Sequence, residues 1–338
     1  MRWTTVIAAA LLAVAMAAPA DARPGLGWRL HPTGSDARLR GLSAVSPLVA
    51  WASGSGGTVL RTTDGGRTWA QVGPPNTSTL DFRDIEAFDA SHAVAMAAGE
   101  GDSSRVYRTD DGGRSWRLTQ ANTLPTGFYD CMAFFDDRHG LILGDPQNGR
   151  FEILATDDGG RSWRILPSDG MPPAQEGEAA FAASGECLAV RGRDAWIGSG
   201  GGADSRVYHS TDGGRTWHAT ATPLPSNGSS GVFAVAFRDR DHGVAVGGDY
   251  KPPNAGAAAT SRDGGRTWSA SAATVGGYRS GVAWLGSAVI AVGPTGSDVS
   301  LDGGQHWRTF DSGSFDTVDC PDVCWAAGEK GRIATLMP

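Results

Sequence analysis

Twelve charged or tyrosine side chains could do chemistry in this chain, because they stand beside expected strands and do not recur from one repeat to the next. Residues of this kind act together when loops on a rigid scaffold bring them to one place. Arg40, Arg83 and Arg279 share what we interpret as one position at a strand start, where guanidinium groups could clamp a carboxylate. The predicted partner-binding set is Arg40, Arg83, Asp84, Tyr129, Asp130, Asp145, Glu178, Asp249, Tyr250, Lys251, Arg279 and Asp316.

The elements that must position these residues follow from an internal repeat. Six copies of an octapeptide end in tryptophans that recur every 39 to 54 residues, a period typical of β-propellers with four-stranded blades. The aspartate and glycines of each copy suit a tight hairpin turn, and the tryptophan is expected to be buried between blades. The residues assigned to this structural role are Asp64, Trp69, Asp111, Trp116, Asp158, Trp163, Asp212, Trp217, Asp263, Trp268, Asp302 and Trp307.

The two ends of the chain complete the blade count. One full repeat predicts strands over 130–135, 140–143, 150–155 and 163–166. The C-terminal region predicts only three strands, over 315–320, 324–327 and 332–336, while Gly27 to Leu30 forms an unpartnered fourth strand that carries Trp28. Pairing the two closes the ring and removes its exposed edges. The sequence therefore predicts an all-β, seven-bladed propeller in one domain, residues 23–338.

The octapeptides match the Asp-box, or BNR, pattern Ser/Thr-x-Asp-x-Gly-x-Thr/Ser-Trp. Across the mature chain the sequence resembles the photosystem II assembly and stability factor family and its bacterial YVTN repeat-like relatives, some of them loosely named oxidoreductase or glycosyl hydrolase. That resemblance implies an exported ring that binds partner polypeptides through an arginine-containing surface. We expect a protein or peptide partner on the irregular rim, a monomer, and no cofactor, metal or catalytic residue.

The alternative is a glycoside hydrolase of the sialidase-like Asp-box type, acting on a carboxylated or extracellular glycan. Tyr129 or Tyr250 would be the nucleophile, supported by Glu178, with Asp84 or Asp145 as the acid. The string Phe82-Arg83-Asp84-Ile85 lacks the proline of the Phe/Tyr-Arg-Ile-Pro start of that family. Seven blades in place of six also favour the binding module.

Three turns share the spacing Asp-x-x-His, at Asp89 to His92, Asp136 to His139 and Asp239 to His242. They fall at equivalent hairpins between the first and second strands of their blades. A histidine repeated at one turn position is expected to brace that turn by a hydrogen bond, since metal binding would require the three turns to converge.

The beginning of the chain predicts export. A basic start is followed by an apolar run from Val6 to Ala18, which is too short to span a bilayer, and by Ala20-Asp21-Ala22. We interpret residues 1–22 as a signal peptide of a periplasmic or secreted protein without stable membrane insertion. The net charge of −7 excludes a basic field for nucleic acid.

Export permits disulfides among the four cysteines. Cys320 and Cys324 bracket a turn between two expected strands, so we predict a disulfide between them. Cys131 and Cys187 could be bridged or could be two buried thiols.

Overall fold

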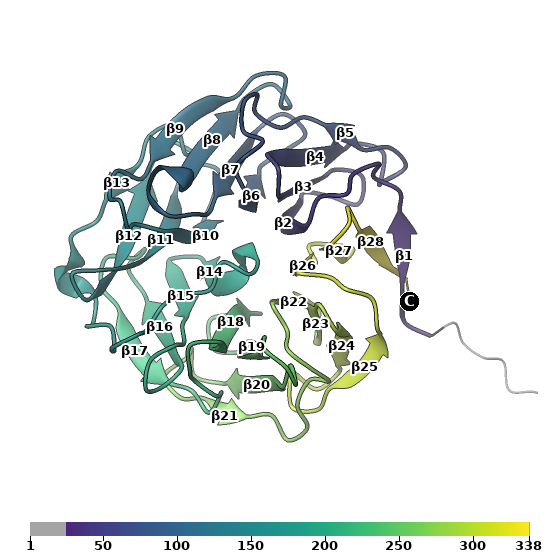
Figure 1. The fold of residues 1–338 in the computed structure, drawn as a ribbon. Coiled ribbons are helices and arrows are strands. Elements are labelled where there is room, and N and C mark those ends of the chain that lie inside the picture. The colour runs from purple at the N-terminus through teal and green to yellow at the C-terminus, as the bar shows by residue number, and fades with distance from the viewer. Residues whose placement is uncertain (1–24, 338) are drawn as a thin grey trace, which may run out of the picture.

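The computed structural model describes residues 25–337, which form seven four-stranded antiparallel sheets arranged around a central axis (Figure 1). The predicted seven-bladed propeller is confirmed. The signal peptide assigned to residues 1–22 lies outside the described residues. No helix within residues 25–337 is long and apolar enough to cross a membrane.

Each blade begins with its innermost strand and ends with its outermost strand. Blade 1 consists of β2 (Leu39–Ala44), β3 (Ala50–Gly54), β4 (Thr58–Thr62) and β5 (Ala70–Gln71). Blade 2 consists of β6 (Phe82–Ala87), β7 (Ala93–Ala97), β8 (Arg105–Thr109) and β9 (Arg117–Ala121). Blade 3 consists of β10 (Tyr129–Phe134), β11 (Gly140–Gln147), β12 (Arg150–Thr156) and β13 (Arg164–Ile165).

The remaining blades repeat the pattern. Blade 4 consists of β14 (Leu188–Arg191), β15 (Asp194–Gly198), β16 (Arg206–Ser210) and β17 (His218–Ala221). Blade 5 consists of β18 (Ser230–Phe237), β19 (Gly243–Asp249), β20 (Gly256–Ser261) and β21 (Ser269–Ala270). Blade 6 consists of β22 (Gly281–Leu285), β23 (Ala288–Gly293), β24 (Gly296–Ser300) and β25 (Arg308–Asp311). Short 3₁₀ helices are η1 (Gly101–Ser103), η2 (Ser168–Gly170) and η3 (Gly185–Cys187).

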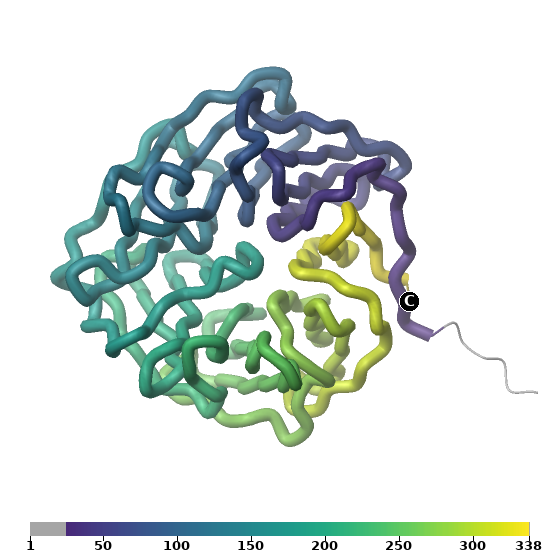
Figure 2. Tube along the Cα trace, viewed as in Figure 1, coloured from purple at the N-terminus to yellow at the C-terminus, as the bar shows by residue number. Residues whose placement is uncertain are grey.

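Blade 7 joins the two ends of the described chain, as the sequence predicts. It contains β26 (Thr317–Asp319), β27 (Trp325–Ala327) and β28 (Ile333–Met337), and its fourth strand is β1 (Gly27–His31). Trp28 pairs with Leu336 in the antiparallel register of β1 and β28. Figure 2 shows the purple N-terminal tube running beside the yellow C-terminal strands. The ring is thus closed by hydrogen bonds between segments that are far apart in the sequence.

The repeated aspartates brace their own turns. In blade 3 the Asp158 carboxylate accepts hydrogen bonds from the Thr156 hydroxyl at 2.8 Å and from the amide and hydroxyl of Ser162 at 2.9 and 2.7 Å. The same contacts recur at the five other boxes, with His306 in place of the hydroxyl residue at the last one. The carboxylates of the box aspartates therefore stabilise their own turns through hydrogen bonds.

The box tryptophans pack against the preceding blade. Trp116 of blade 2 meets Trp51 of blade 1 edge to face at 6.4 Å between ring centroids, and Trp69 of blade 1 meets Trp325 of blade 7 in the same way at 5.9 Å. Trp217 of blade 4, which is 3% exposed, joins a core cluster formed by blades 3 and 4. Trp217 and Trp307 are buried, whereas Trp69, Trp116, Trp163 and Trp268 are half-buried, so the predicted burial is complete at only two of the six boxes.

Replacing Asp158 by alanine should lower the free energy of unfolding by ~1–2 kcal/mol, because it removes three hydrogen bonds from a turn, much as loss of a helix cap does. Urea denaturation followed by tryptophan fluorescence measures the change. Asp157→Ala is the matched control, since in the described part of the chain the Asp157 side chain makes only an exposed ion pair with Arg164. Equal losses in the two variants would contradict the bracing role.

One expected element is wrong. Glu178 is expected to stand beside a strand, but the innermost strand of blade 4 is β14, which begins only at Leu188. The intervening residues turn towards the middle of the ring, where the teal chain before β14 lies in Figure 1. We call residues 180–187 the axial segment; its η3 turn contacts the inner strands β2, β6, β10 and β18.

Both cysteine pairs are bridged. The predicted disulfide between Cys320 and Cys324 is present at the turn between β26 and β27. A second disulfide joins Cys131 on β10 to Cys187 at the end of the axial segment. The question that the sequence leaves open for Cys131 and Cys187 is therefore answered by a bridge that ties the axial segment to blade 3.

Candidate functional site

A cavity of about 560 Å³ opens around the axis at the end of the sheets opposite the Asp boxes. It is built from the starts of the innermost strands, from the β19–β20 and β23–β24 loops, and from the axial segment. We call it the rim cavity. Its charged and aromatic lining residues are Arg38, Arg40, Arg83, Phe128, Asp130, Asp145, Phe181, Phe233, Tyr250, Tyr278 and Asp316.

β-Bulges aim four of these side chains into the cavity. The pairing of the first two strands slips by one residue at Arg40 in blade 1, at Arg83 in blade 2, at Asp130 in blade 3 and at Phe233 in blade 5. A bulge leaves one extra residue unpaired and redirects its side chain. Because the bulge recurs at the same level of the ring, side chains of four blades converge on one space.

Arg279 does not belong to this set, which corrects its predicted position. The glycine of blade 6 that faces the strand start, Gly293, packs on Tyr278 and Arg279 as Gly54 packs on Arg38 and Leu39. Arg279 therefore corresponds to the buried Leu39 and not to Arg40. It is 1% exposed and pairs with Asp298 at 2.6 Å. A shift of one residue along a strand moves a side chain to the other face.

The three guanidinium groups of the rim cavity are held by two carboxylates. Arg40 and Arg83 both contact Asp81 Oδ2 at 2.9 Å, and Arg38 pairs with Asp316 at 2.6 Å. Burial, and then the charges of Arg83 and Arg38, lower the pKa of Arg40. Arg40 Nε is buried and has no hydrogen-bond partner among the described residues. Three cations that share two carboxylates form a site suited to an anionic group.

Several predicted residues lie elsewhere. Asp84 is 4% exposed and accepts the amides of Ile85 and Met132 at 2.8 and 2.6 Å. Tyr129 is 1% exposed, and burial raises its pKa to about 12. Asp249 and Lys251 flank Tyr250 in their loop without lining the cavity. The structure thus brings together Arg40, Arg83, Asp130, Asp145, Tyr250 and Asp316.

Glu178 is fully engaged within the fold. Its carboxylate accepts hydrogen bonds from the Ser199 hydroxyl at 2.6 Å, from Arg206 Nε at 2.9 Å and from the Tyr208 hydroxyl at 3.1 Å. It is 5% exposed and lies outside the rim cavity. In the glycosidase alternative, Tyr129, Glu178 and Asp84 could be the catalytic tyrosine, glutamate and aspartate. These three residues therefore do not share one site.

Sequence reasoning misses Arg38 and most of the aromatic wall. Phe181 stacks on Phe233 with centroids 4.0 Å apart, and Phe233 meets Tyr278 edge to face at 4.7 Å. Arg38 stands two residues before Arg40, so its charge was a usable signal. Phe181 belongs to the axial segment, whose path no local pattern reveals.

A second cavity, of about 520 Å³, lies on the other side of the axial segment, and we call it the channel cavity. Four of its lining residues are carboxylates: Asp84, Glu86, Glu186 and Asp319. Glu186 belongs to the axial segment and accepts hydrogen bonds from Thr317 Oγ1 and the Val318 amide, each at 2.8 Å, and from the Val282 amide. These bonds tie the axial segment to blades 6 and 7.

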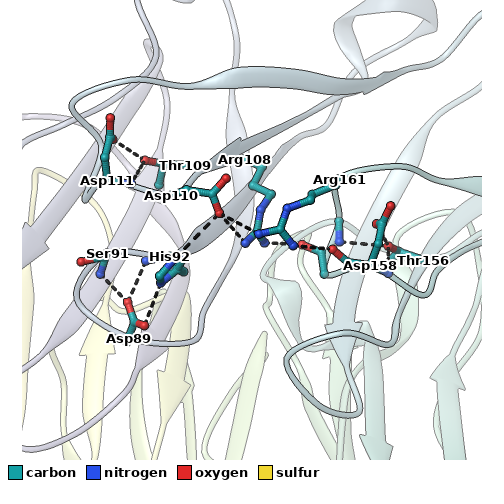
Figure 3. A network of polar contacts seen from close by, with 12 residues as sticks. Asp89, Ser91, His92, Arg108, Thr109, Asp110, Asp111, Thr156, Asp158 and Arg161 are labelled. Carbon is teal, nitrogen blue, oxygen red and sulfur yellow. Dashed lines mark hydrogen bonds and ion pairs between the residues drawn. The ribbon is translucent and has the colours of Figure 1, made fainter.

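The Asp-box face is occupied by bracing contacts (Figure 3). His92 Nδ1 lies 2.8 Å from Asp89, and the equivalent contacts of His139 with Asp136 and of His242 with Asp239 are each 2.9 Å. Asp110 pairs with Arg108 at 2.6 Å and with Arg161 of the next blade at 3.3 Å. The predicted histidine braces are confirmed. Between residues 25 and 337, no group of three or more His, Cys, Asp or Glu side chains is arranged to hold a metal ion.

The fold and the rim cavity define a seven-bladed Asp-box propeller with a polar and aromatic cavity on its axis. Residues 32–244 match the DUF6242 beta propeller domain, and the chain belongs to this family. No curated protein matches the sequence.

Solved structures with the same fold are similar at low identity. YCF48 bound to a D1 peptide superposes with a TM-score of 0.65 at 16% identity, covering 94% of this chain and 96% of that one. YCF48 from Cyanidioschyzon merolae gives 0.66 at 16% identity, with 92% and 99% covered. The GH74 xyloglucanase from Xanthomonas campestris gives 0.57 at 15% identity, with 90% of this chain and 60% of that chain covered. At these identities the likeness is one of fold.

Proposed function

We propose that this protein is a non-catalytic binding module that takes a peptide segment of a partner protein into the rim cavity. A carboxylate of that segment, either its C-terminus or an acidic side chain, would be held by Arg40 and Arg83. The observation that carries the proposal is the convergence of three guanidinium groups on an aromatic-walled cavity, where Arg40 Nε is buried and finds no hydrogen-bond partner within residues 25–337. Guanidinium forks match carboxylates in geometry and charge.

The comparison with known folds supports the same function. YCF48, which has the same fold as this chain, has been solved with a D1 peptide bound. The resemblance of the Asp-box repeats to the photosystem II assembly factors agrees with a role in binding polypeptides. A peptide also suits the site physically, because aromatic rings supply apolar contact while the charged groups fix orientation.

We also propose that residues 1–22 direct export and that the propeller works outside the cytoplasm. The apolar run from Val6 to Ala18 and the small residues before Arg23 support this. Two disulfides suit an oxidising compartment.

Equilibrium dialysis against pooled N-acetylated tetrapeptides, read by mass spectrometry, tests the binding function. We expect retention of peptides that carry a free C-terminal carboxylate or an acidic side chain over neutral amidated ones. The double variant Arg40→Gln with Arg83→Gln should reduce that retention at least ~10-fold, because it removes two charge-assisted contacts.

Arg67→Gln is the control, since Arg67 is an exposed arginine in an Asp-box turn on the opposite face. Thermal unfolding of each variant shows that the fold is intact. Equal retention of neutral amidated peptides, or equal effects of the rim and control variants, would show that the cavity does not bind carboxylates.

A further inference from the structure

The rim cavity contains a second charged group of opposite sign. Asp130 on β10 and Asp145 on the neighbouring strand β11 both line it, next to Arg83. Asp130 is the bulge residue of its strand and is 1% exposed. Asp145 lies opposite the strand start, with its amide bonded to the Phe128 carbonyl at 3.0 Å. The two carboxylates thus belong to blade 3 and share the cavity with Arg83 of the neighbouring blade 2.

The resident arginines do not neutralise this pair. Arg83 donates to Asp81 at 2.9 Å and to the Ala182 carbonyl at 3.1 Å, and no ion pair in the described part of the chain reaches Asp130 or Asp145. Among residues 25–337, Asp130 Oδ2 is buried without a hydrogen-bond partner, and the Asp145 carboxylate accepts only the Ala180 amide, at 3.2 Å. A buried carboxylate without donors is costly unless a proton or a cation joins it.

The protonation behaviour agrees with this geometry. Burial, and then the charge of Asp145, raise the pKa of Asp130 well above its ordinary value, although Arg83 acts in the opposite direction. Burial also raises the pKa of Asp145 to about 6. The Asp130 and Asp145 carboxylates therefore lack a fully compensating positive charge, even though Arg83 lies nearby.

The walls of the cavity suit an organic cation. Phe128 and Phe181 line the same space, as does Tyr250, which is 45% exposed. Aromatic faces attract ammonium and guanidinium groups, and the attraction grows when water is excluded. A hydrated divalent metal would gain nothing from such walls, whereas a lysine or arginine side chain can place its stem on the rings and its charge on the carboxylates.

We infer that Asp130 and Asp145 form a subsite for the cationic side chain of the bound peptide, so that the preferred ligand carries a basic residue next to its carboxylate. This inference rests on the proposed function, because the same peptide fills both subsites. The volume of about 560 Å³ lies within the range of cavities that enclose a ligand of a few residues. Specificity then comes from the spacing between two opposite charges.

The test measures how tightly the intact protein binds pairs of N-acetylated tetrapeptides that differ at one position. In each pair a lysine is replaced by norleucine, or an arginine by citrulline, while the free C-terminal carboxylate is kept. At pH 7.5 we expect the charged member to bind at least ~10-fold more tightly. Asp130→Asn should abolish this preference while the preference for a free carboxylate over an amide remains.

Asp36→Asn is the matched control, because Asp36 is exposed and does not line the cavity. Asp130→Asn should fold, since it removes a buried charge and keeps the shape; its thermal unfolding checks this, and Asp145→Asn gives a second variant. Binding of peptides without any difference between lysine and norleucine overturns the cation subsite and leaves the proposed function standing. Failure of the parent protein to retain any peptide overturns both.

Discussion

Replacing Cys131 and Cys187 together by alanine should lower the free energy of unfolding by ~4 kcal/mol, because their disulfide closes a loop with a sequence separation of 56 residues. Such a cross-link restricts the unfolded chain more strongly as the closed loop becomes longer. Both cysteines are fully buried, so the bond also fixes the position of the axial segment in the native state. Urea denaturation under non-reducing conditions measures the loss.

The same substitution should weaken peptide binding, if the proposed function is right, by more than the change in stability alone would cause. Residues 180–183 of the axial segment line the rim cavity, and Arg83 donates to the Ala182 carbonyl. A segment released at Cys187 would no longer hold Phe181 and Arg83 in place.

The second disulfide supplies the control. Cys320 and Cys324 have a sequence separation of only four, so the variant with both replaced by alanine should lose ~2 kcal/mol. It lies away from the rim cavity, and its peptide binding should match that of the parent protein. Greater destabilisation by the short-loop variant, or equal effects on binding, would contradict the anchoring role of Cys131 and Cys187.

Most of the architecture could be predicted because the same octapeptide occurs six times in the sequence. Each box combines an aspartate and glycines that specify one turn with a tryptophan that needs a neighbouring blade. The strand that carries Trp28 has no partner in its own part of the sequence, and the last blade lacks a fourth strand. The sequence therefore predicted that these two segments pair and close the ring. Local chemistry and long-range pairing pointed to the same fold, and β1 pairs with β28 accordingly.

The candidate site was harder to predict because it depends on breaks in the repeat. The bulges at Arg40, Arg83 and Asp130 have no sequence signature, so Arg279 was aligned one residue out of register with them. The axial segment is a non-repeated insertion held by Cys187 and Glu186 through contacts distant in sequence. Its course can be known only once the ring around it is closed.

The axial segment also divides the axis into two electrostatically different spaces. On the rim side, arginines face carboxylates. On the channel side, the four carboxylates Asp84, Glu86, Glu186 and Asp319 share one cavity, and the arginines of that lining are Arg191 and Arg238. Burial raises the pKa of Asp84 to about 7, of Asp319 to about 6 and of Glu186 to about 8. Burial, and then the charges of Asp84 and Asp319, raise the pKa of Glu86.

These shifts make the protein less stable as the pH rises. At these four carboxylates the folded state holds protons between pH 4.5 and 8 that the unfolded chain has released, so they lower the free energy of unfolding as the pH rises. Burial lowers the pKa of His31 and His209, which act in the opposite direction in the lower part of this window. The shift of Glu186 alone corresponds to a loss on the order of 5 kcal/mol. The box aspartates stabilise the protein more as the pH rises, but only at acidic pH. The hydroxyl and amide of Thr68 lower the pKa of Asp64 to about 2. The contribution of Asp64 to the free energy of unfolding is therefore lost as the pH falls towards that value.

Urea denaturation at pH 5 and pH 8 should therefore show a more stable protein at pH 5. Glu86→Gln sharpens the test, because among the described residues the Glu86 side chain makes no hydrogen bond that the amide would break. We expect this variant to match the parent protein at pH 5 and to exceed its stability at pH 8, since it removes one like charge from the channel cavity. Asp322→Asn, at the exposed turn after β26, is the control and should leave the pH dependence unchanged. If stability instead rises from pH 5 to pH 8 in the parent protein, the four carboxylates are ionised in the fold and their charges must be compensated.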